Sequence, residues 1–374
     1  MYDQVREDTL FTIFYTAVTT MAMMSSCYLL FRQGNAFAPD IVTPARLRRW
    51  TGVFFAFLAL NHVWYMPILF LDSRDDILMT ELIGGMLDNM TVFPLSIVVL
   101  VAMLQDRRRP LWPVAVITAP LVIGMAVCVA RRSDDLYPVI YAYVLLLVAG
   151  LIVYMVRALR QYGRWLRDNY ADLEHKEVWQ SFVVLAIILL VFAFYELSSE
   201  GRIYQYTMQA IAVVLICYLL WRVETLSDLG SDIHDTEDGC NSKSLPAEDA
   251  VEDSVLSISI RNNIELLLKQ HCEEAQLYLQ YDISVIELAR QIGTNRAYLS
   301  KYFALQGTTY NAYINGLRVR HFVSLYHESA AAHQSVTAQQ LAHMSGFRNY
   351  NTFGVAFKRM MGMTATEWMH NVTE

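Results

Sequence analysis

Seven long apolar runs in the first 223 residues constrain the fold of this chain more than any other feature. Each run has 20 to 23 residues, and the runs cover residues 9–31, 50–71, 82–104, 111–130, 136–156, 178–197 and 204–223. A helix of about 20 apolar residues spans the hydrocarbon core of a bilayer. With 55% hydrophobic and only 17% charged residues overall, the composition is that of a membrane protein. We therefore expect a seven-span helical domain over residues 1–223.

The positive charges of the connecting segments predict which side of the membrane each segment occupies. One set of segments carries 13 Lys and Arg residues, and the opposite set carries five. Positive charge is retained on the cytoplasmic side, so we expect the N-terminus outside and everything after Arg222 in the cytoplasm. The first run is too long and its leading residues too acidic for a signal peptide. The third run, which contains Asp88, Asn89 and Pro94, is the weakest; a re-entrant segment there would invert what precedes it.

Residues 224–254 differ abruptly from the runs before them. They contain ten acidic residues and one basic residue, Lys243. Such a composition is typical of a disordered segment, and about 31 residues of flexible chain extend on the order of 30 Å. We expect an acidic flexible linker here, followed by a separate domain over residues 255–374. The predicted fold class is all-α: a polytopic seven-transmembrane-helix bundle, an acidic linker and a tandem helix-turn-helix DNA-binding domain.

The last 120 residues contain a helical pattern that occurs twice. After a helical stretch expected over residues 258–279, Asp282 or Ser284 is a candidate cap for a helix that buries Leu288 and Ala289. Gly293 permits the positive φ of a turn. Asn295 can cap the next helix, in which Leu299 and Phe303 face inward and Ala297, Lys301 and Ala304 face outward.

A second copy aligns Leu341 and Ala342 with Leu288 and Ala289, and Phe357 with Phe303, with one extra residue between these points. In this copy Gly346 is the expected turn and Asn349 the expected cap. Phe353 and Phe357 form the expected inward face, with Asn351, Val355 and Lys358 outward. The intervening YNAYINGLRVRHFVSLYHES predicts one long helix, a rod that holds two DNA-recognition helices about one turn of DNA, roughly 34 Å, apart.

These motifs resemble the AraC family of bacterial transcription regulators over residues 284–368. The resemblance rests on LA-x3-G-TNRAYLSKYF, G-TTYNAYIN-x-LRVR and LAHMSGF-RNYNTF-x3-F-x3-MG. The family usually has proline where Ala365 stands, which leaves the closing turn open. The resemblance implies sequence-specific binding to double-stranded DNA by the second helix of each copy.

The resemblance also implies roles for individual residues. Base-facing positions of the first recognition helix are Arg296, Ala297, Ser300 and Lys301, and those of the second are Tyr350, Asn351 and Val355, with Asn349 beside them. Arg and Lys pair with guanine, Asn pairs with adenine, and Val contacts a thymine methyl group. Arg318, Arg320, Lys358 and Arg359 are the expected phosphate partners, which position the protein without specifying sequence.

Simpler interpretations stand beside these roles. Asn349 and Asn351 can serve only as helix caps, and Arg296 can be an ordinary surface residue. Tyr298 and Tyr302 are expected in the core rather than as stacking platforms. A net charge of about +2 over residues 255–374, from ten basic and eight acidic residues, is low for a DNA-binding domain.

Polar side chains within the apolar runs point to a sensing site. Asn61, His62, Asp88 and Glu196 fall at mid-depth or toward the outside, where polar groups are costly and often functional. They favour a pocket for a small polar or cationic ligand, or proton sensing by His62. The alternative is that they only bond neighbouring helices.

No catalytic motif is present, so we expect no enzyme, no cofactor and no metal site, and the five cysteines are expected to be buried thiols. The leading hypothesis is a one-component transcription regulator tethered to the bacterial inner membrane. Its expected partners are double-stranded DNA, membrane lipid, a second copy of the chain, RNA polymerase, and a small-molecule or proton signal. The alternatives are a transporter or membrane receptor whose tail binds proteins, and an adaptor that binds a partner protein through the same module.

Overall fold

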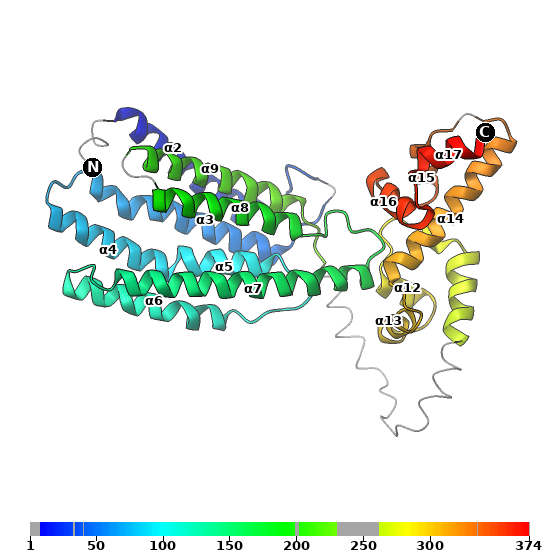
Figure 1. Cartoon of the computed structure of the whole chain (residues 1–374), viewed down its shortest axis with the longest axis horizontal. Coiled ribbons are helices and arrows are strands. Elements are labelled where there is room, and N and C mark those ends of the chain that lie inside the picture. The colour runs from blue at the N-terminus through cyan, green and yellow to red at the C-terminus, as the bar shows by residue number, and fades with distance from the viewer. Residues whose placement is uncertain are drawn as a thin grey trace, which may run out of the picture. The chain divides into compact units, whose positions relative to one another are not determined.

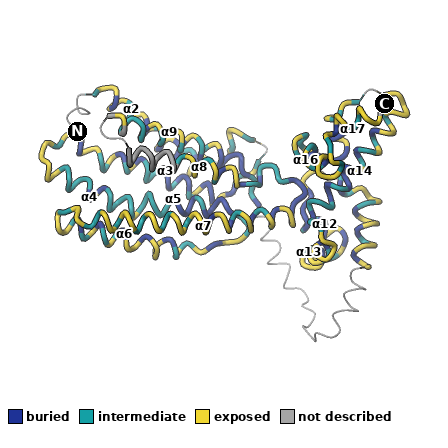
Figure 2. The backbone as a smooth tube through the Cα atoms, in the orientation of Figure 1, coloured by how far each residue is buried: buried dark blue, intermediate teal, exposed yellow. Residues whose placement is uncertain are grey.

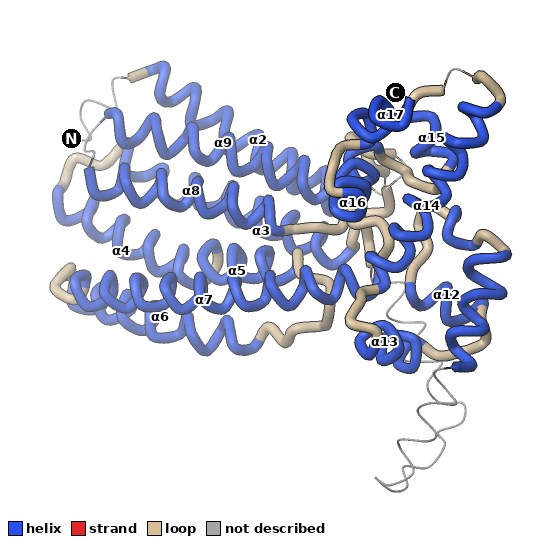
Figure 3. The backbone as a smooth tube through the Cα atoms, turned by 45° about the vertical axis from the view of Figure 1, so that its right-hand side comes forward, coloured by secondary structure: helices blue, strands red, loops and turns tan. Residues whose placement is uncertain are grey.

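A computed structural model of the chain describes residues 8–32, 34–39, 41–198, 202–229, 262–334 and 336–373. The side chains of residues 69, 189–198, 202, 204 and 373 lie outside this description. The described residues form helices joined by turns and loops, with no strand among them (Figure 3). The all-α fold class is therefore confirmed.

The chain divides into two compact units. The first contains Met1–Tyr162 and Val178–Ser231, and the second contains Gly163–Glu177 and Asp232–Glu374. The short piece Gly163–Glu177 lies between two apolar runs in sequence but belongs to the C-terminal unit. Most of the expected linker, from residue 230 to 254, falls outside the described residues.

The helices of the first unit run alongside one another and follow the apolar runs of the sequence (Figure 1). They are α2 (Thr9–Phe31), α3 (Ala45–Tyr65) with η1 (Met66–Leu69), α4 (Arg74–Met90), α5 (Val92–Ala102), α6 (Trp112–Arg131), α7 (Tyr137–Asn169), α8 (Trp179–Ser198) and α9 (Arg202–Thr225). Six helices among the described residues are long and apolar enough to cross a membrane, and the described part of α8, Trp179–Ile188, is a shorter apolar helix.

The third apolar run, residues 82–104, was expected to be the least certain membrane span, and it belongs to one helical span with a break. Helices α4 and α5 together make a 29-residue candidate span, Arg74–Ala102. Thr91 separates them with φ −127° and ψ −74°, three residues before Pro94. Because proline lacks an amide N–H and clashes with the preceding turn, it fits the first turn of α5.

The outer faces of these helices are apolar, as expected of a lipid-facing surface. Large side chains such as Ile123 of α6 and Leu145 and Leu146 of α7 are exposed, and exposed positions recur along both helices (Figure 2). Cys27 and Cys217 are exposed as well, so the expectation of uniformly buried thiols was wrong for these two; Cys128 and Cys272 are buried, and Cys240 lies outside the described residues.

Small residues allow the helices to approach closely. A methyl group on Gly52 would lie 2.8 Å from the Leu30 side chain, and one on Gly84 would lie 2.5 Å from the Tyr65 ring. The Ser26 hydroxyl also donates to the Gly52 carbonyl across α2 and α3 (2.8 Å). Such small-residue contacts are typical of helix packing in membranes.

The end of α9 and the chain just after it are hydrogen-bonded to loops of the same unit. The buried carboxylate of Glu224 accepts hydrogen bonds from the backbone N–H groups of Ala36 and Phe37 (3.0 and 3.2 Å). The Gln105 side chain donates to the Ser227 carbonyl and accepts from the Leu229 amide, both at 2.9 Å. Ordered structure thus continues past residue 224, where the sequence favoured a flexible linker.

The C-terminal unit is a series of short helices around one long one. Residues 262–267 are helical. They are followed by η2 (Leu268–Glu274), η3 (Leu277–Leu279), α12 (Val285–Gln291), α13 (Arg296–Leu305), α14 (Tyr310–Ala331), α15 (Ala338–Met344), α16 (Tyr350–Met361) and α17 (Ala365–Thr373). The expectation of one uniform helix up to residue 279 was wrong, because η2 is π-helical and Gln276 adopts φ +53°.

Candidate nucleic-acid interface

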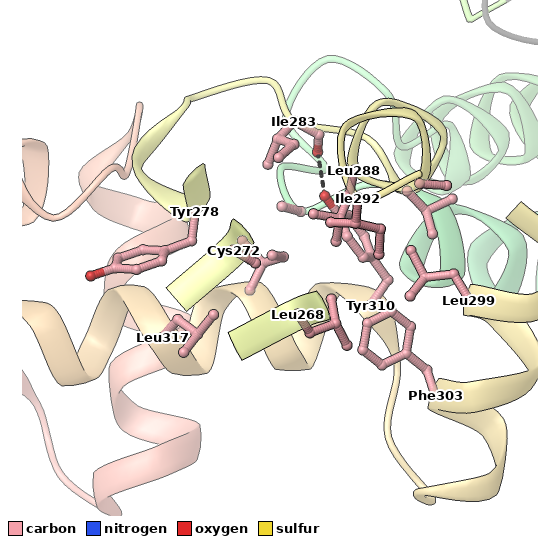
Figure 4. Packing of buried hydrophobic residues seen from close by; sticks show 14 of the residues in the cluster. Leu268, Cys272, Tyr278, Ile283, Leu288, Ile292, Leu299, Phe303, Tyr310 and Leu317 are labelled. Atoms are coloured by element: carbon pink, nitrogen blue, oxygen red, sulfur yellow. Dashed lines mark hydrogen bonds between the residues drawn. The ribbon is translucent and has the colours of Figure 1, made fainter. Parts of the chain in front are cut away.

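The first helix-turn-helix unit, α12–α13, forms around a compact apolar core. Leu288, Ala289, Leu299 and Phe303 are at most 3% exposed, as their helical spacing predicted. The Tyr310 hydroxyl donates to the Ile283 carbonyl within this core (3.1 Å), which fixes the start of α14 against the loop before α12 (Figure 4). The core therefore fixes α13 with its opposite face in solvent.

Both helices of this unit are capped by their own side chains. Ser284 accepts a hydrogen bond from the Glu287 amide (3.2 Å) and begins α12. Asn295 accepts from the Tyr298 amide (2.9 Å) and begins α13. Gly293 makes the turn between them with φ +73°. Of the two candidate caps for α12, Ser284 is used, whereas Asp282 forms ion pairs with Arg348 and Lys176.

Helix α13 presents the expected residues on its outer face. Ala297, Lys301 and Ala304 are exposed, and Arg296 and Ser300 are partly exposed. Tyr302 packs against the core, but Tyr298 is 43% exposed, so the expectation that Tyr298 is buried was wrong. The accessible side of α13 therefore combines two cations with small and hydroxyl side chains.

The second unit, α15–α16, repeats this plan with an aromatic core. Phe353 and Phe357 are fully buried and pack against Phe322 of α14 with ring centroids 4.6 and 5.3 Å away, the first tilted and the second edge-to-face. Gly346 makes the turn with φ +89°. The Asn349 side chain accepts from the Asn351 amide (2.7 Å) and caps α16, so one of the two functions weighed for Asn349 is confirmed.

Helix α16 turns Asn351, Val355, Lys358 and Arg359 to the outside, while Tyr350 is partly exposed and packs beside Phe353. Val355 is 73% exposed. Lys358 and Arg359 lie in the last turn of α16. The exposed face of α16 thus carries amide, phenol and apolar side chains in its first turns and cationic side chains in its last turn.

Arg318 does not lie where a phosphate partner must. It is 1% exposed, and its guanidinium donates to the backbone carbonyls of Tyr278 and Gln280 (2.7 and 2.8 Å). Burial lowers the pKa of this guanidinium, while Tyr310, Asp172 and Asp282 act in the opposite direction. The assignment of Arg318 to phosphate contact was therefore wrong: it ties α14 to the segment before α12. Arg320 on the same helix is exposed.

The closing turn forms without the proline that the family usually has. The Glu367 amide donates to the Thr364 hydroxyl (3.3 Å), and the Thr364 amide donates to the Glu367 carboxylate (2.9 Å). This reciprocal pair is a capping box, and it begins α17 at Ala365. The hydrogen bonds to Thr364 lower the pKa of Glu367.

A family model described as a helix-turn-helix domain matches residues 288–371, which span the paired units. The C-terminal domain is an AraC-type helix-turn-helix domain. No curated protein and no solved structure matches the chain. A domain of this type binds double-stranded DNA, so the chain is a DNA-binding regulator, and the apolar helices before the AraC-type domain fit an inner-membrane protein.

The polar residues of the membrane helices make two sets of hydrogen bonds, one to Asp88 and one at His62. Asp88 accepts from the Asn61 amide (2.7 Å) and from the Tyr65 hydroxyl (2.9 Å). The buried His62 ring instead lies 3.0 Å from the Gln209 amide oxygen. Glu196 lies in α8, but its side chain is outside the described residues. Neither of two surface hollows in this unit, one along α2 and one lined by residues such as Pro94 and Val114, includes Asn61, His62 or Asp88.

One acidic residue beside the AraC-type domain was not predicted. The Asn349 side-chain amide donates to the Glu174 carboxylate at 2.6 Å. The two residues are 175 positions apart, and the sequence around Glu174 reads only as a charged connection between two apolar runs. No local pattern could have placed it at the start of a recognition helix.

Proposed function

We propose that this protein is a one-component transcription regulator tethered to the inner membrane. It binds promoter DNA sequence-specifically through two helix-turn-helix units and responds to a signal sensed by its membrane helices. The observation that carries the proposal is the matched construction of α13 and α16. Each is capped by an asparagine, anchored by a buried pair of side chains, and exposes several of the expected base-contacting residues on its opposite face.

The first recognition helix has the chemistry of a guanine-reading surface. Arg296 in the first turn and Lys301 one turn further are both accessible, with Ala297 and Ser300 between them. Arginine and lysine pair with the O6 and N7 acceptors of guanine in the major groove. The small residues allow the helix to approach the bases closely.

The second recognition helix has a different preference. Asn351 is exposed in the first turn of α16, beside Asn349 and Tyr350, and Val355 follows one turn later. Asparagine makes paired hydrogen bonds to adenine, and an apolar side chain contacts the thymine methyl group. Lys358 and Arg359 at the end of this helix, and Arg320 on α14, are exposed cations suited to phosphate contact.

The membrane part supports a tethered form of the regulator. We propose seven spans over residues 1–223, a DNA-binding domain over 255–374, and an acidic tether between them that begins after the ordered residues 224–229. The bias of basic residues, 13 against five, supports an outside N-terminus and a cytoplasmic DNA-binding domain. A pair of chains on one promoter, with RNA polymerase as a further contact, fits the family.

Sensing is proposed for the polar groups of α3 and α4. Asn61 and Tyr65 bind the Asp88 carboxylate between these helices, and His62 joins α3 to Gln209 on α9. A ligand or proton that altered either contact would shift one helix against another. In a reporter strain, Asp88→Asn and His62→Gln should change the response to medium pH or to cationic solutes while leaving DNA affinity in vitro unchanged. An unchanged response in both variants would contradict the sensing role.

Selection from random-sequence duplex DNA tests the proposed function. The full chain in nanodiscs of neutral phosphatidylcholine should enrich two short sequence blocks about ten base pairs apart. Arg296→Ala should relax one block and Asn351→Ala the other, each at a cost of about 1–3 kcal/mol. Glu265→Ala, a change on an exposed face of the helix before η2, provides the control. If the selected DNA pool stays random while the protein is folded, the domain does not bind DNA sequence-specifically in this chain.

A further inference from the structure

The connection between α7 and α8 is an integral part of the DNA-binding unit. Helix α7 has 33 residues, more than the about 20 that cross a bilayer, and its last turns together with the following loop, Gly163–Glu177, belong to the C-terminal unit. Ala171 is fully buried in the core of the first helix-turn-helix unit. Tyr170 makes an antiparallel bridge with Ser284, the residue that caps α12. We call residues 168–177 the docking segment.

The long helix α14 holds the docking segment by side-chain amides. Asn311 donates to the carbonyls of Tyr170 and Ala171 (3.2 and 2.6 Å), and Asn315 donates to the Ala171 carbonyl (3.1 Å). Asn315 is only 6% exposed, so its amide would be left without a partner if the segment departed and nothing replaced it. These hydrogen bonds form a specific binding site on α14 for the backbone of residues 170–171.

The docking segment also reaches the second helix-turn-helix unit. Glu174 accepts from Asn349, the cap of α16, at 2.6 Å. Lys176 lies 3.6 Å from Asp282, which in turn pairs with Arg348 at 3.0 Å, just before that cap. The segment therefore contacts the start of one recognition helix directly and is linked by charge to the turn that precedes it.

The segment places a carboxylate near the start of the other recognition helix too. Desolvation raises the pKa of Asp168, while the positive charges of Arg167, Arg164 and Arg296 act in the opposite direction. Arg296 is the first residue of α13. Between residues 168 and 177 the sequence has four acidic residues and one basic residue. The Glu174 carboxylate therefore lies at the N-terminal end of α16, where the helix dipole favours negative charge, and the Asp168 carboxylate interacts electrostatically with Arg296 of α13.

In a helix-turn-helix complex, the N-terminal residues of the recognition helix meet the bases and phosphates of DNA. We propose that the docking segment occupies this same surface and competes with DNA, so that the regulator binds its promoter only when the segment is released. The proposal rests on the DNA-binding function proposed above. The Asn349 amide donates to the Glu174 carboxylate in the docked state, so a DNA phosphate at the same amide would meet the negative charge of that carboxylate. Only the released fraction of the protein binds DNA freely, and the apparent affinity falls in proportion to that fraction.

Affinity measurements on the full chain in neutral nanodiscs test this competition. The probe is a duplex that carries the sequence enriched in the selection. Glu174→Ala removes the carboxylate that binds Asn349 at the start of α16, and it changes no residue proposed to contact DNA. This variant should bind the duplex roughly tenfold more tightly than the wild type does. Glu265→Ala removes the same charge from an exposed position of the same unit and should leave the affinity unchanged. Ala171→Phe, which cannot fit a fully buried position, should also bind more tightly; a gain of affinity cannot come from misfolding.

Hydrogen exchange gives a second, independent measurement. When the duplex is added to the wild type, amides 170–177 should lose protection while those of α13 and α16 gain it. Equal affinities for wild type, Glu174→Ala and Ala171→Phe, with amides 170–177 equally protected in free and bound protein, would overturn the competition and leave the proposed function standing. If neither wild type nor variants select any sequence, the proposed function fails, and the competition with it.

Discussion

The two helix-turn-helix units follow the same plan but differ in the turn between their helices. In α12–α13 the turn glycine, Gly293, stands two residues before the cap Asn295, whereas in α15–α16 Gly346 stands three residues before Asn349. The extra residue allows Phe347, 1% exposed, to fill the core beside Phe353, with ring centroids 5.3 Å apart. The Arg318 guanidinium lies 5.6 Å from the Phe347 ring. One additional residue therefore makes the second turn part of the core and joins it to α14.

The two turn glycines consequently serve different purposes. At Gly293 a methyl group would meet nothing within 4 Å, so only the positive φ requires glycine. At Gly346 the same group would lie 2.8 Å from the Cα and 3.0 Å from the carbonyl oxygen of Leu279. Identical sequence signals thus mark a loosely surrounded turn in one unit and a tightly packed one in the other.

The largest effect is expected from substitution of Phe353, which occupies in the second unit the position that Leu299 occupies in the first. Its ring lies within 5.5 Å, between centroids, of four other aromatic rings. Phe353→Ala should destabilise the second unit by about 3–5 kcal/mol because it leaves a cavity. Phe353→Leu, which installs the residue of the first unit, should cost less, about 1–2 kcal/mol. Hydrogen exchange of α15–α16 in the full chain measures this, with α12–α13 as internal reference; equal losses in both units would show that they do not open separately.

The second prediction contrasts the glycines. Gly346→Ala combines an unfavourable positive φ with a backbone clash and should destabilise the second unit by about 3 kcal/mol. Gly293→Ala has the φ penalty alone and should cost about 1 kcal/mol in the first unit. The ratio of amide exchange rates in each unit, variant against wild type, gives both values. Similar costs at the two positions would mean that Leu279 moves aside readily.

The third prediction concerns base preference and sharpens the contrast between the recognition helices. The accessible start of α13 carries Arg296 and Lys301, whereas that of α16 carries Asn351 and Val355. Asn351→Arg should move the preference of the second sequence block from adenine toward guanine by about 1–2 kcal/mol and leave the first block unchanged. Binding to duplexes with single base changes in each block measures it. A change in both blocks would indicate that the helices do not read separate sites.

Sequence periodicity predicted the parts of the fold that depend on local patterns. The first span, Thr9–Phe31, has the expected ends because Asp8 caps it and its apolar run is uninterrupted. The caps Asn295 and Asn349, the turns at Gly293 and Gly346, and the buried pair Phe353 and Phe357 follow in the same way from side-chain chemistry close in sequence.

Contacts between distant residues were not predictable. Arg318 and Arg320 stand two positions apart in LRVR, yet one is buried against three backbone carbonyls before α12 and the other is exposed. Arg318 shares the four-residue spacing of buried residues on α14, such as Ile314 and Phe322, whereas Arg320 does not. No local pattern, however, identifies the backbone carbonyls of residues 278–281 as the partners of Arg318. The docking segment was missed for the same reason: its partners Asn311, Asn315 and Asn349 lie far away in sequence.

A competitor carried on the same chain cannot be diluted. The docking segment is joined covalently to α7 on one side and to α8 on the other, and the DNA-binding domain follows on the same polypeptide. Its effective concentration at the recognition helices is set by the length and geometry of the connecting chain, and not by how much protein the cell makes. A higher expression level would add more protein molecules, but it would leave the fraction of molecules with a released docking segment unchanged. Promoters would then be occupied in the order of their intrinsic affinities, the strongest sites first, as release of the segment becomes more frequent.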